Sequence, residues 1–282
     1  MSIQLNVSAI AGASQAAWKQ AKPILIRDVI LLPTAGFLGV ILLWWIVASL
    51  KSDLIPTPYQ ALIANLDYIL NPFYQRGPGD LGIGWLLLAS IRRVLLGFTL
   101  GALVAIPLGF LIGISKPAMM ALNPLIQIFK PVSPLAWLPI ALAIFNLADP
   151  SAIFVIFITS LWPTIINTAL GVSSVSKDYL QVAQVLEMPR WRQITKIIWP
   201  ASLPYIFTGL RISLGIAWLV IVAVEMLTGG IGIGFFVWDE WSRFNLSSVF
   251  LAILVIGLTG LVFDYAVGKI QELVTHRVVK VQ

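Results

Sequence analysis

Three charged side chains lie inside long apolar stretches of this sequence, where an ionisable group is costly and commonly has a function. Lys130 lies in IFKPVSP, and Arg211 and Glu225 share a later apolar stretch. Pro131 removes a backbone donor directly after Lys130, so it disturbs a helix and frees carbonyl groups there. Because a cation beside a broken helix attracts anions, we take Lys130, Arg211 and Glu225 as candidates for an anion pathway.

Each of these charges also has a purely structural interpretation. Lys130 lies about eight residues inside its apolar stretch, so its ammonium group can extend to the cytoplasmic interface. Arg211 and Glu225 are about 21 Å and about 40° apart on an ideal helix, too far for a direct pair. They either both face a pathway or each pair with a neighbouring span, and both alternatives stay open. Asp264 is interpreted as an interfacial or paired group.

No motif for catalysis or for ATP binding accompanies these charges. The sequence lacks the phosphate loop GxxxxGK[S/T], and GFLIGISK at 109–116 has the wrong spacing. It contains no cysteine and one histidine, which excludes disulfides, thiolate metal sites and cysteine catalysis. Paired carboxylates and nucleophile–base arrangements are also missing. We therefore expect no catalytic residue, metal ligand or cofactor in this chain.

The composition is that of a membrane protein. Apolar residues make up 59% of the chain and charged residues 11%, against roughly 45–50% and about 25% in soluble domains. The mean hydropathy is +0.94, and the chain has 11 tryptophans, a residue enriched at membrane–water interfaces. The net charge of +6 comes from scattered basic residues. We therefore expect membrane lipid, and no nucleic acid, as a partner.

Six apolar stretches have about the length that a helix needs to cross a bilayer, ~20 residues. We predict an all-α membrane protein with six transmembrane helices, at 30–50, 94–114, 122–147, 152–170, 203–227 and 249–267. The third is irregular because it contains Pro124, Pro131, Pro134 and Pro139. Lys and Arg are more frequent at the two chain ends and after the second and fourth stretches. The positive-inside rule therefore predicts that both termini are cytoplasmic.

The segments outside the spans are expected to form tails and loops. Residues 1–29 and 271–282 are predicted cytoplasmic tails, and residues 51–83 a periplasmic loop. In that loop Pro58 suits a helix start with Thr57 as its cap, and the apolar spacing predicts a short amphipathic helix on the membrane surface. The following NPFYQRGPGD is typical of turns.

Glycines mark two further places in the sequence. In GGIGIG at 229–234, the backbone amides either line a small-anion site or form a flexible turn, and both alternatives stay open. In the second span, small residues recur mostly four positions apart, at Gly97, Gly101, Ala105, Gly109 and Gly113. This spacing predicts close helix packing.

A long polar segment, QVAQVLEMPRWRQITKIIWPASLP at 181–204, separates the fourth and fifth spans. Asp178 suits the cap of a helix that continues to about Leu186. Pro189 is expected to end that helix, and Trp191 begins a second apolar face. Such a segment either docks into a groove on a cytosolic partner or rests on lipid headgroups. The spacing alone does not separate these two alternatives.

This segment resembles the EAA loop of binding-protein-dependent ABC transporter permeases of the type I importer fold, E-A-A-x3-G-x9-I-x-L-P. The spacing holds throughout, with matching positions at Gln181, Val182, Ala183, Glu187, Ile197 and Trp199–Pro200. Glu187 takes the place of the glycine, which would permit a left-handed turn. Glutamate adopts that turn only at a cost. Glu187 either tolerates the turn, or a helical link broken by Pro189 replaces it, and both alternatives stay open.

The resemblance continues through 90–115, 123–145, 200–226 and 229–245, which are similar to the nitrate, sulfonate, taurine and bicarbonate branch of these permeases. It implies a permease core over 84–270 with five transmembrane helices, and a coupling loop at 178–200. It also implies the residues on which an ATP-binding subunit docks: Gln181, Val182, Ala183, Leu186, Glu187, Arg190 and Trp191.

The resemblance also implies a function and partners. The chain is expected to be a pore-forming subunit without its own ATPase site, in an ATP-driven importer of the cell inner membrane. Partner ATPase subunits would hold ATP and Mg, a second permease subunit would complete the pathway, and a substrate-binding protein would dock outside. The expected cargo is a small inorganic anion, nitrate or nitrite first, then bicarbonate or sulfonate and taurine. A stand-alone channel or ion-coupled transporter is the alternative from another class, but the inverted repeat common in the latter is missing.

Overall fold

The computed structural model describes residues 31–50, 55–77 and 79–279, and divides the chain into the units Met1–Ala64 and Asn65–Gln282. The first unit contains helices α2 (Leu32–Leu50) and α3 (Pro58–Ala64). Nearly every side chain of α2 is exposed, as expected for a helix in lipid. Thr57 caps α3 as predicted, since its hydroxyl accepts from the Gln60 amide while the Gln60 side chain accepts from the Thr57 amide.

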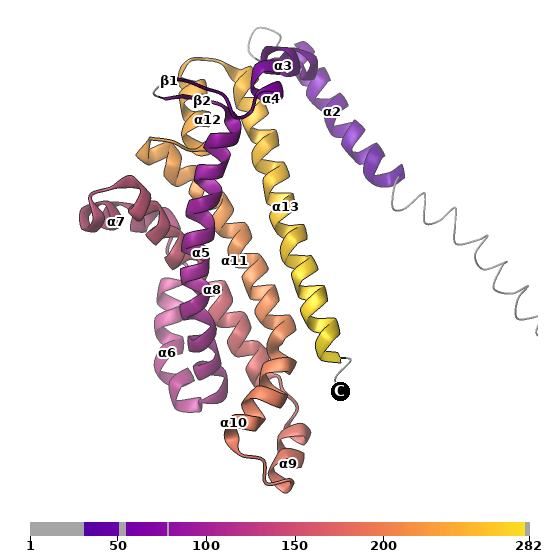
Figure 1. Ribbon diagram of the computed structural model, residues 1–282, viewed down its shortest axis with the longest axis vertical. Helices are drawn as coiled ribbons and strands as arrows, with labels where there is room; N and C mark the ends of the chain where they lie inside the picture. The colour runs from indigo at the N-terminus through magenta and orange to yellow at the C-terminus, as the bar shows by residue number, and fades with distance from the viewer. Residues whose placement is uncertain (1–30, 51–54, 78, 280–282) are drawn as a thin grey trace, which may run out of the picture. The chain divides into compact units, whose positions relative to one another are not determined.

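Four long helices form the body of the second unit: α5 (Ile83–Ile114), α8 (Ala148–Ser173), α11 (Trp199–Thr228) and α13 (Leu246–Val279). They run along the long axis of Figure 1. At one end, the hairpin end, lie α4 (Leu66–Leu70), strands β1 (Gln75–Gly77) and β2 (Asp80–Leu81), and α12 (Ile233–Ser242). The antiparallel hairpin replaces the unpaired turns expected after Asn71.

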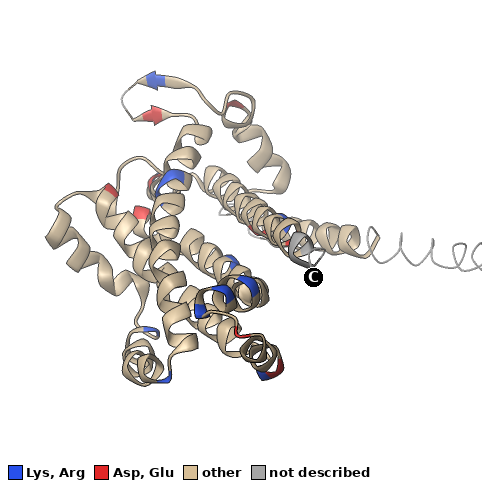
Figure 2. Cartoon of the chain, turned by 60° about the horizontal axis from the view of Figure 1, so that its bottom comes forward, with Lys and Arg blue, Asp and Glu red and all other residues tan. Residues whose placement is uncertain are grey.

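Six shorter elements complete the second unit. Helix α6 (Lys116–Phe129), the 3-10 turn η2 (Pro134–Trp137) and α7 (Leu138–Phe145) follow α5. Helices α9 (Lys177–Val185) and α10 (Arg190–Gln193), with the π-helical η3 (Ile194–Ile198), lie at the end opposite the hairpin, which we call the elbow end (Figure 1). Figure 2 shows ribbon segments coloured blue for Lys and Arg gathered there, while most of the long helices are tan.

The described chain has five helices that are long and apolar enough to cross a membrane, which confirms the predicted helical membrane class. A sixth span exists only if α6 and the η2–α7 segment are counted as one span. The axes of these two segments differ by 93°. The third stretch, 122–147, which was predicted to be irregular, is therefore divided into two segments. The break falls at Lys130–Ser133, where Pro131 and Pro134 lack the amide hydrogens that would continue the helix.

Helices α5 and α8 pack at close backbone distance through the predicted small residues. A Cβ at Gly97 would lie 2.7 Å from the Ile153 carbonyl oxygen, and one at Gly109 would lie 2.8 Å from that of Ile165. Ala105, between these positions, is fully buried. The small-residue spacing therefore has the packing role that it predicted.

A buried apolar core joins α5, α8, α11 and α12 near the hairpin end. Its fully buried members include Val94, Val155, Ile156, Ile221, Val224 and Ile233. The outer faces of the long helices expose large apolar side chains, among them Leu103 on α5, Leu219 on α11 and Leu258 on α13. Such exposure fits a surface covered by lipid or by other subunits.

Candidate functional site

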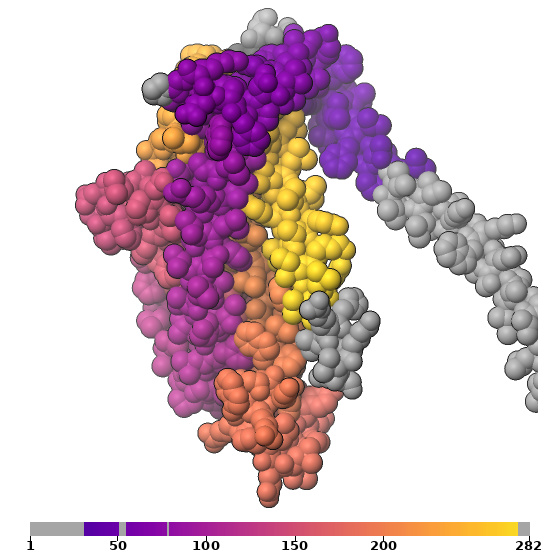
Figure 3. Space-filling model, in the orientation of Figure 1, coloured from indigo at the N-terminus to yellow at the C-terminus, as the bar shows by residue number. Residues whose placement is uncertain are grey.

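The elbow is the segment from Ser176 to Ile198, and it projects from the second unit in the space-filling view (Figure 3). Its first helix begins at Lys177, and Ser176 is its cap because the serine hydroxyl accepts from the Asp178 amide at 3.2 Å. The predicted cap at Asp178 is therefore wrong by two residues. Asp178 instead lies in the first turn, where its negative charge interacts favourably with the positive end of the helix dipole.

Glu187 adopts the left-handed conformation that the sequence comparison assigned to glycine, with φ of 50°. The amide of Met188 donates to the Ala183 carbonyl at 2.9 Å, and the amide of Glu187 donates to Gln184 at 3.0 Å. This is the Schellman ending of a helix, with glutamate in the usual glycine position. Of the two alternatives for this joint, the left-handed turn is therefore the one observed. Helix α9 ends at Val185, and Pro189 is the N-cap residue of α10.

The elbow exposes a group of apolar side chains. Val182, Leu186 and Trp191 are 57%, 66% and 73% exposed, and Val185 is more exposed still. Gln181, Glu187 and Arg190 are exposed as well. Ala183 differs, because it is only 1% exposed and packs inside the elbow. The predicted docking residues thus separate into an exposed set and one internal residue.

Glu225, on α11, is buried beneath the glycine segment at the hairpin end. Its carboxylate accepts from Arg93 at 2.7 Å, from the Ser90 hydroxyl at 2.8 Å and from the Gly234 amide at 2.9 Å. A Cβ at Gly232 would lie 2.3 Å from the carboxyl carbon of Glu225. The glycine segment therefore does bind an anion through a backbone amide, and that anion is the carboxylate of the protein itself.

Arg93, on α5, connects this cluster to α8. Its guanidinium also donates to Asp149 at 2.6 and 2.9 Å and to the Ile231 carbonyl at 2.6 Å. Arg93 and Glu225 are both buried, whereas Asp149 is half-exposed. The pairing alternative for Glu225 is thus the one observed, and the cluster fastens α5, α8, α11 and the glycine segment together.

Arg211 pairs with Asp264 across α11 and α13, so the two predicted charges of α11 have different partners. Both side chains of this second pair are about half exposed. The structure therefore does not bring Arg211 and Glu225 together. It also supports the paired interpretation of Asp264.

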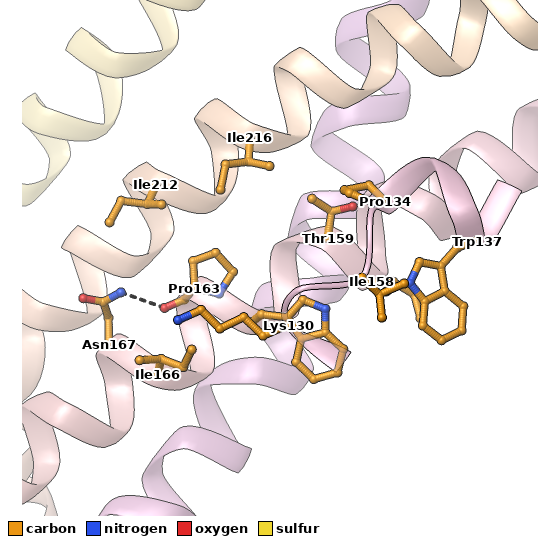
Figure 4. Close-up of a pocket in the computed structure, with 12 residues that line it drawn as sticks. Lys130, Pro134, Trp137, Ile158, Thr159, Pro163, Ile166, Asn167, Ile212 and Ile216 are labelled. Carbon is orange, nitrogen blue, oxygen red and sulfur yellow. Dashed lines mark hydrogen bonds between the residues drawn. The ribbon is translucent and has the colours of Figure 1, made fainter. Parts of the chain in front are cut away.

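Lys130 caps the C-terminus of α6 and lines a cavity of about 400 Å³ with residues of η2, α8 and α11 (Figure 4). Among the residues that the structure describes it forms no ion pair, unlike Arg93 and Arg211. Its amino group points toward Asn167 and Pro163 in Figure 4. Of the three predicted pathway charges, Lys130 is therefore the one left available to a ligand.

A second hollow, of about 600 Å³, opens at the hairpin end between the hairpin and α12. Asp80, Asp239, Glu240 and Arg243 line it, and Arg243 pairs with Asp239 at 2.9 Å. Burial raises the pKa of Tyr68, another lining residue, above its ordinary value. This hollow is polar and bears mostly carboxylates, in contrast to the Lys130 cavity.

Sequence reasoning missed Arg93, Asp149 and Trp137. Arg93 lies just before the second predicted span, and nothing in the spacing pairs it with Glu225, more than a hundred residues away. Trp137 carries an indole N–H that is buried without a hydrogen-bond partner. The proline pair that breaks the third span was the available signal that a cavity forms there.

Comparison with known proteins identifies the family of the chain. Residues 105–279 match the model of the binding-protein-dependent transport system inner membrane component. A nitrate import permease protein, NrtB, of Synechocystis sp. is 45% identical over 86% of this chain and 88% of its own length. A bicarbonate transport system permease protein, CmpB, of Synechococcus elongatus is 44% identical over 87% of this chain and 89% of its own.

A solved structure supports the fold independently of close sequence similarity. The inward-facing MetNI methionine ABC transporter matches with a TM-score of 0.60 at 14% identity, over 67% of this chain and 94% of that chain. At that identity the likeness concerns the arrangement of helices alone. It agrees with the helical core described above.

Proposed function

Because this chain belongs to the binding-protein-dependent transport system inner membrane components, we propose that it is the permease subunit of an ATP-driven importer of a small inorganic anion, nitrate first. The observation that carries this is the similarity to two nitrate permeases, at 45% and 46% identity over 86% and 85% of the chain. Bicarbonate is the second candidate, since bicarbonate permeases reach 44% identity. Sulfonate or taurine comes after these.

The elbow is the proposed docking site of an ATPase subunit that holds ATP and Mg. Its exposed side chains Val182, Leu186 and Trp191 have the apolar character of groove-binding helices. The Schellman bonds at Glu187 fix the angle between α9 and α10, so that a movement of the docked subunit reaches α11 through η3. Ala183 supports this geometry from inside and does not meet the partner.

The elbow end is the proposed cytoplasmic side, with both termini inside, in agreement with the basic residues gathered there (Figure 2). The hairpin end then faces outward. The hollow lined by carboxylates at this end is the proposed docking site of a substrate-binding protein. A second permease subunit, a copy of this chain in the simplest case, completes the pathway.

Docking is tested with Leu186→Asp, which places a charge among the exposed apolar side chains of the elbow. We expect the ATPase subunit to be lost from the purified complex and anion uptake to fall at least about tenfold, the loss that ~1.4 kcal/mol of coupling produces. Gln184→Asp adds the same charge at an exposed polar position and is the control. Normal ATPase retention in Leu186→Asp would exclude the docking role.

The cargo is tested in cells that lack their own nitrate and bicarbonate uptake and carry the complete transporter. We expect ATP-dependent uptake of labelled nitrate that unlabelled nitrite inhibits. Uptake of bicarbonate or taurine in its place would identify the second or third candidate. Uptake that persists without any ATPase subunit would support a channel or an ion-coupled transporter and overturn the proposal.

A further inference from the structure

We propose that the cavity beside the broken third span is an oxyanion-binding site within the pathway, with Lys130 and Trp137 as its hydrogen-bond donors. This inference rests on the proposed function, because it assigns the transported anion to a place in this chain. The cavity has a volume of about 400 Å³ and is bounded by η2, α8 and α11. Its lining includes one cation and no carboxylate.

The first donor is the ammonium group of Lys130, which extends into the cavity in Figure 4. The proline break places it there: α6 stops at Phe129, and the chain turns at Lys130–Ser133 before η2 begins. An ammonium group has three N–H donors and no acceptor. Since no carboxylate of the described residues pairs with Lys130, these donors are available to an anionic ligand.

The second donor is the indole N–H of Trp137, the last residue of η2. This nitrogen is buried and has no hydrogen-bond partner among the described residues. A buried donor without a partner is destabilising, and an acceptor that reached this N–H from the cavity would remove that penalty. Figure 4 shows the Trp137 ring at the opposite side of the cavity from the Lys130 amino group, so a small oxyanion would meet the two donors at successive positions along the cavity and not both at once.

Asn167 supplies a third donor near Lys130. Its amide nitrogen donates to the Pro163 carbonyl at 2.8 Å, which uses one of its two hydrogens. The remaining walls are apolar, with Ile158, Ile166 and Ile212 among them. A volume of about 400 Å³ exceeds that of a small oxyanion, and since a water takes about 30 Å³, the anion would keep part of its hydration.

The residues that line the cavity favour the binding of an anion, but they do not bind it tightly. One cation and a few neutral donors attract an oxyanion, while the apolar walls and retained water allow it to leave, as conduction requires. A taurine molecule would also bring an ammonium group close to Lys130. The site therefore favours a plain inorganic oxyanion such as nitrate or bicarbonate.

The test compares Lys130→Met and Lys130→Arg in the complete transporter. We expect Lys130→Met to lower the maximal rate of nitrate uptake about tenfold or more, the effect of losing a charge-assisted hydrogen bond. The nitrate concentration for half-maximal uptake should change little, because the binding protein captures the ion. Lys130→Arg should retain most of the rate. Lys116→Met, at the exposed start of α6, is the control.

A chemical rescue separates the charge from the fold. Because the chain has no cysteine, a Lys130→Cys variant carries one reactive thiol in this subunit. Aminoethyl methanethiosulfonate, which adds an ammonium group through a disulfide, should restore uptake, whereas the sulfonatoethyl reagent of negative charge should not. Nitrate should also slow the reaction with the negative reagent. Equal rescue by both reagents would overturn the role of the charge.

The second donor is tested with Trp137→Phe, which keeps an aromatic ring and removes the N–H. We expect uptake to fall about threefold to tenfold, consistent with one hydrogen bond. Trp45→Phe, at an exposed position of α2, is the control. Normal uptake in both Lys130→Met and Trp137→Phe, in a transporter that carries nitrate, would overturn this site alone. Absence of nitrate, nitrite and bicarbonate uptake by the unmodified transporter would overturn the proposed function instead.

Discussion

At the scale of single residues, the buried pair of Arg93 and Glu225 has the largest energetic consequence. Both side chains are removed from water, and each has hydrogen bonds that satisfy its charge. Removing one partner leaves the other as an uncompensated buried charge, and such a loss typically costs more than the intact pair contributes.

Arg93→Met is expected to destabilise the protein by about 3–5 kcal/mol, because Glu225 then lies buried without its cation. The thermal unfolding temperature of the purified subunit measures this loss. The double variant with Glu225→Gln should recover part of it. Arg211→Met breaks a half-exposed pair and should lower the unfolding temperature far less; an equal effect of both single variants would contradict the role of burial.

Glu187→Gly is expected to stabilise the elbow by up to about 1 kcal/mol, since a left-handed residue with a side chain costs about 1–2 kcal/mol and the freedom that glycine gains on unfolding offsets part of this. Glu187→Ala removes the carboxylate but keeps the Cβ, and should not stabilise the elbow. Thermal unfolding of the two variants compares them. A more stable alanine variant would show that the carboxylate, and not the backbone, is the source of strain.

At the scale of elements, sequence predicted the helices well and their joints poorly. The apolar stretches and the small residues of α5 follow from local composition and spacing, which determine helix existence and close packing. The cap at Ser176 and the turn at Glu187 are closed by local bonds, but Asp178 suits the cap position as well as Ser176 does. The partners of Arg93 and Arg211, in contrast, depend on contacts between distant segments. No local pattern contains that information.

Gly97→Ala tests the packing of α5 on α8. The added Cβ would lie 2.7 Å from a backbone oxygen, so the two helices must separate, and overpacking of this kind costs about 1–3 kcal/mol. Gly215→Ala and Gly257→Ala, where a Cβ meets nothing within 4 Å, are the matched controls. A drop in unfolding temperature limited to Gly97→Ala is the expected result, and equal effects at all three positions would contradict it.

At the scale of the whole molecule, the second unit contains its own core. Every residue of the two buried clusters lies after Ala64, and the family match also falls inside this unit. Sequence reasoning likewise assigned the permease core to the chain after the first span, because the resemblance begins there. The bend of the third span and the cavity beside it were not foreseen, since proline predicts a break but not its direction.

A chain that begins at Asn65 is therefore expected to keep its helix content and to retain the ATPase subunit. Circular dichroism and co-purification measure these two properties against the full chain. The Leu186→Asp variant of the shortened chain serves as the negative control for retention. Loss of helix content beyond that of the deleted α2 and α3 would show that the second unit depends on the first.

The close contact of α5 with α8 has a mechanical consequence. Backbones that meet through glycines at several levels cannot slide past each other by one turn without placing side chains where no space exists. The two helices are therefore expected to move together as one rigid body, which Arg93 connects to its neighbours near the hairpin end. Any change of shape must then occur where other segments join this pair of helices, and the proline break beside Lys130 is one such joint, between α5 and α8 along the chain.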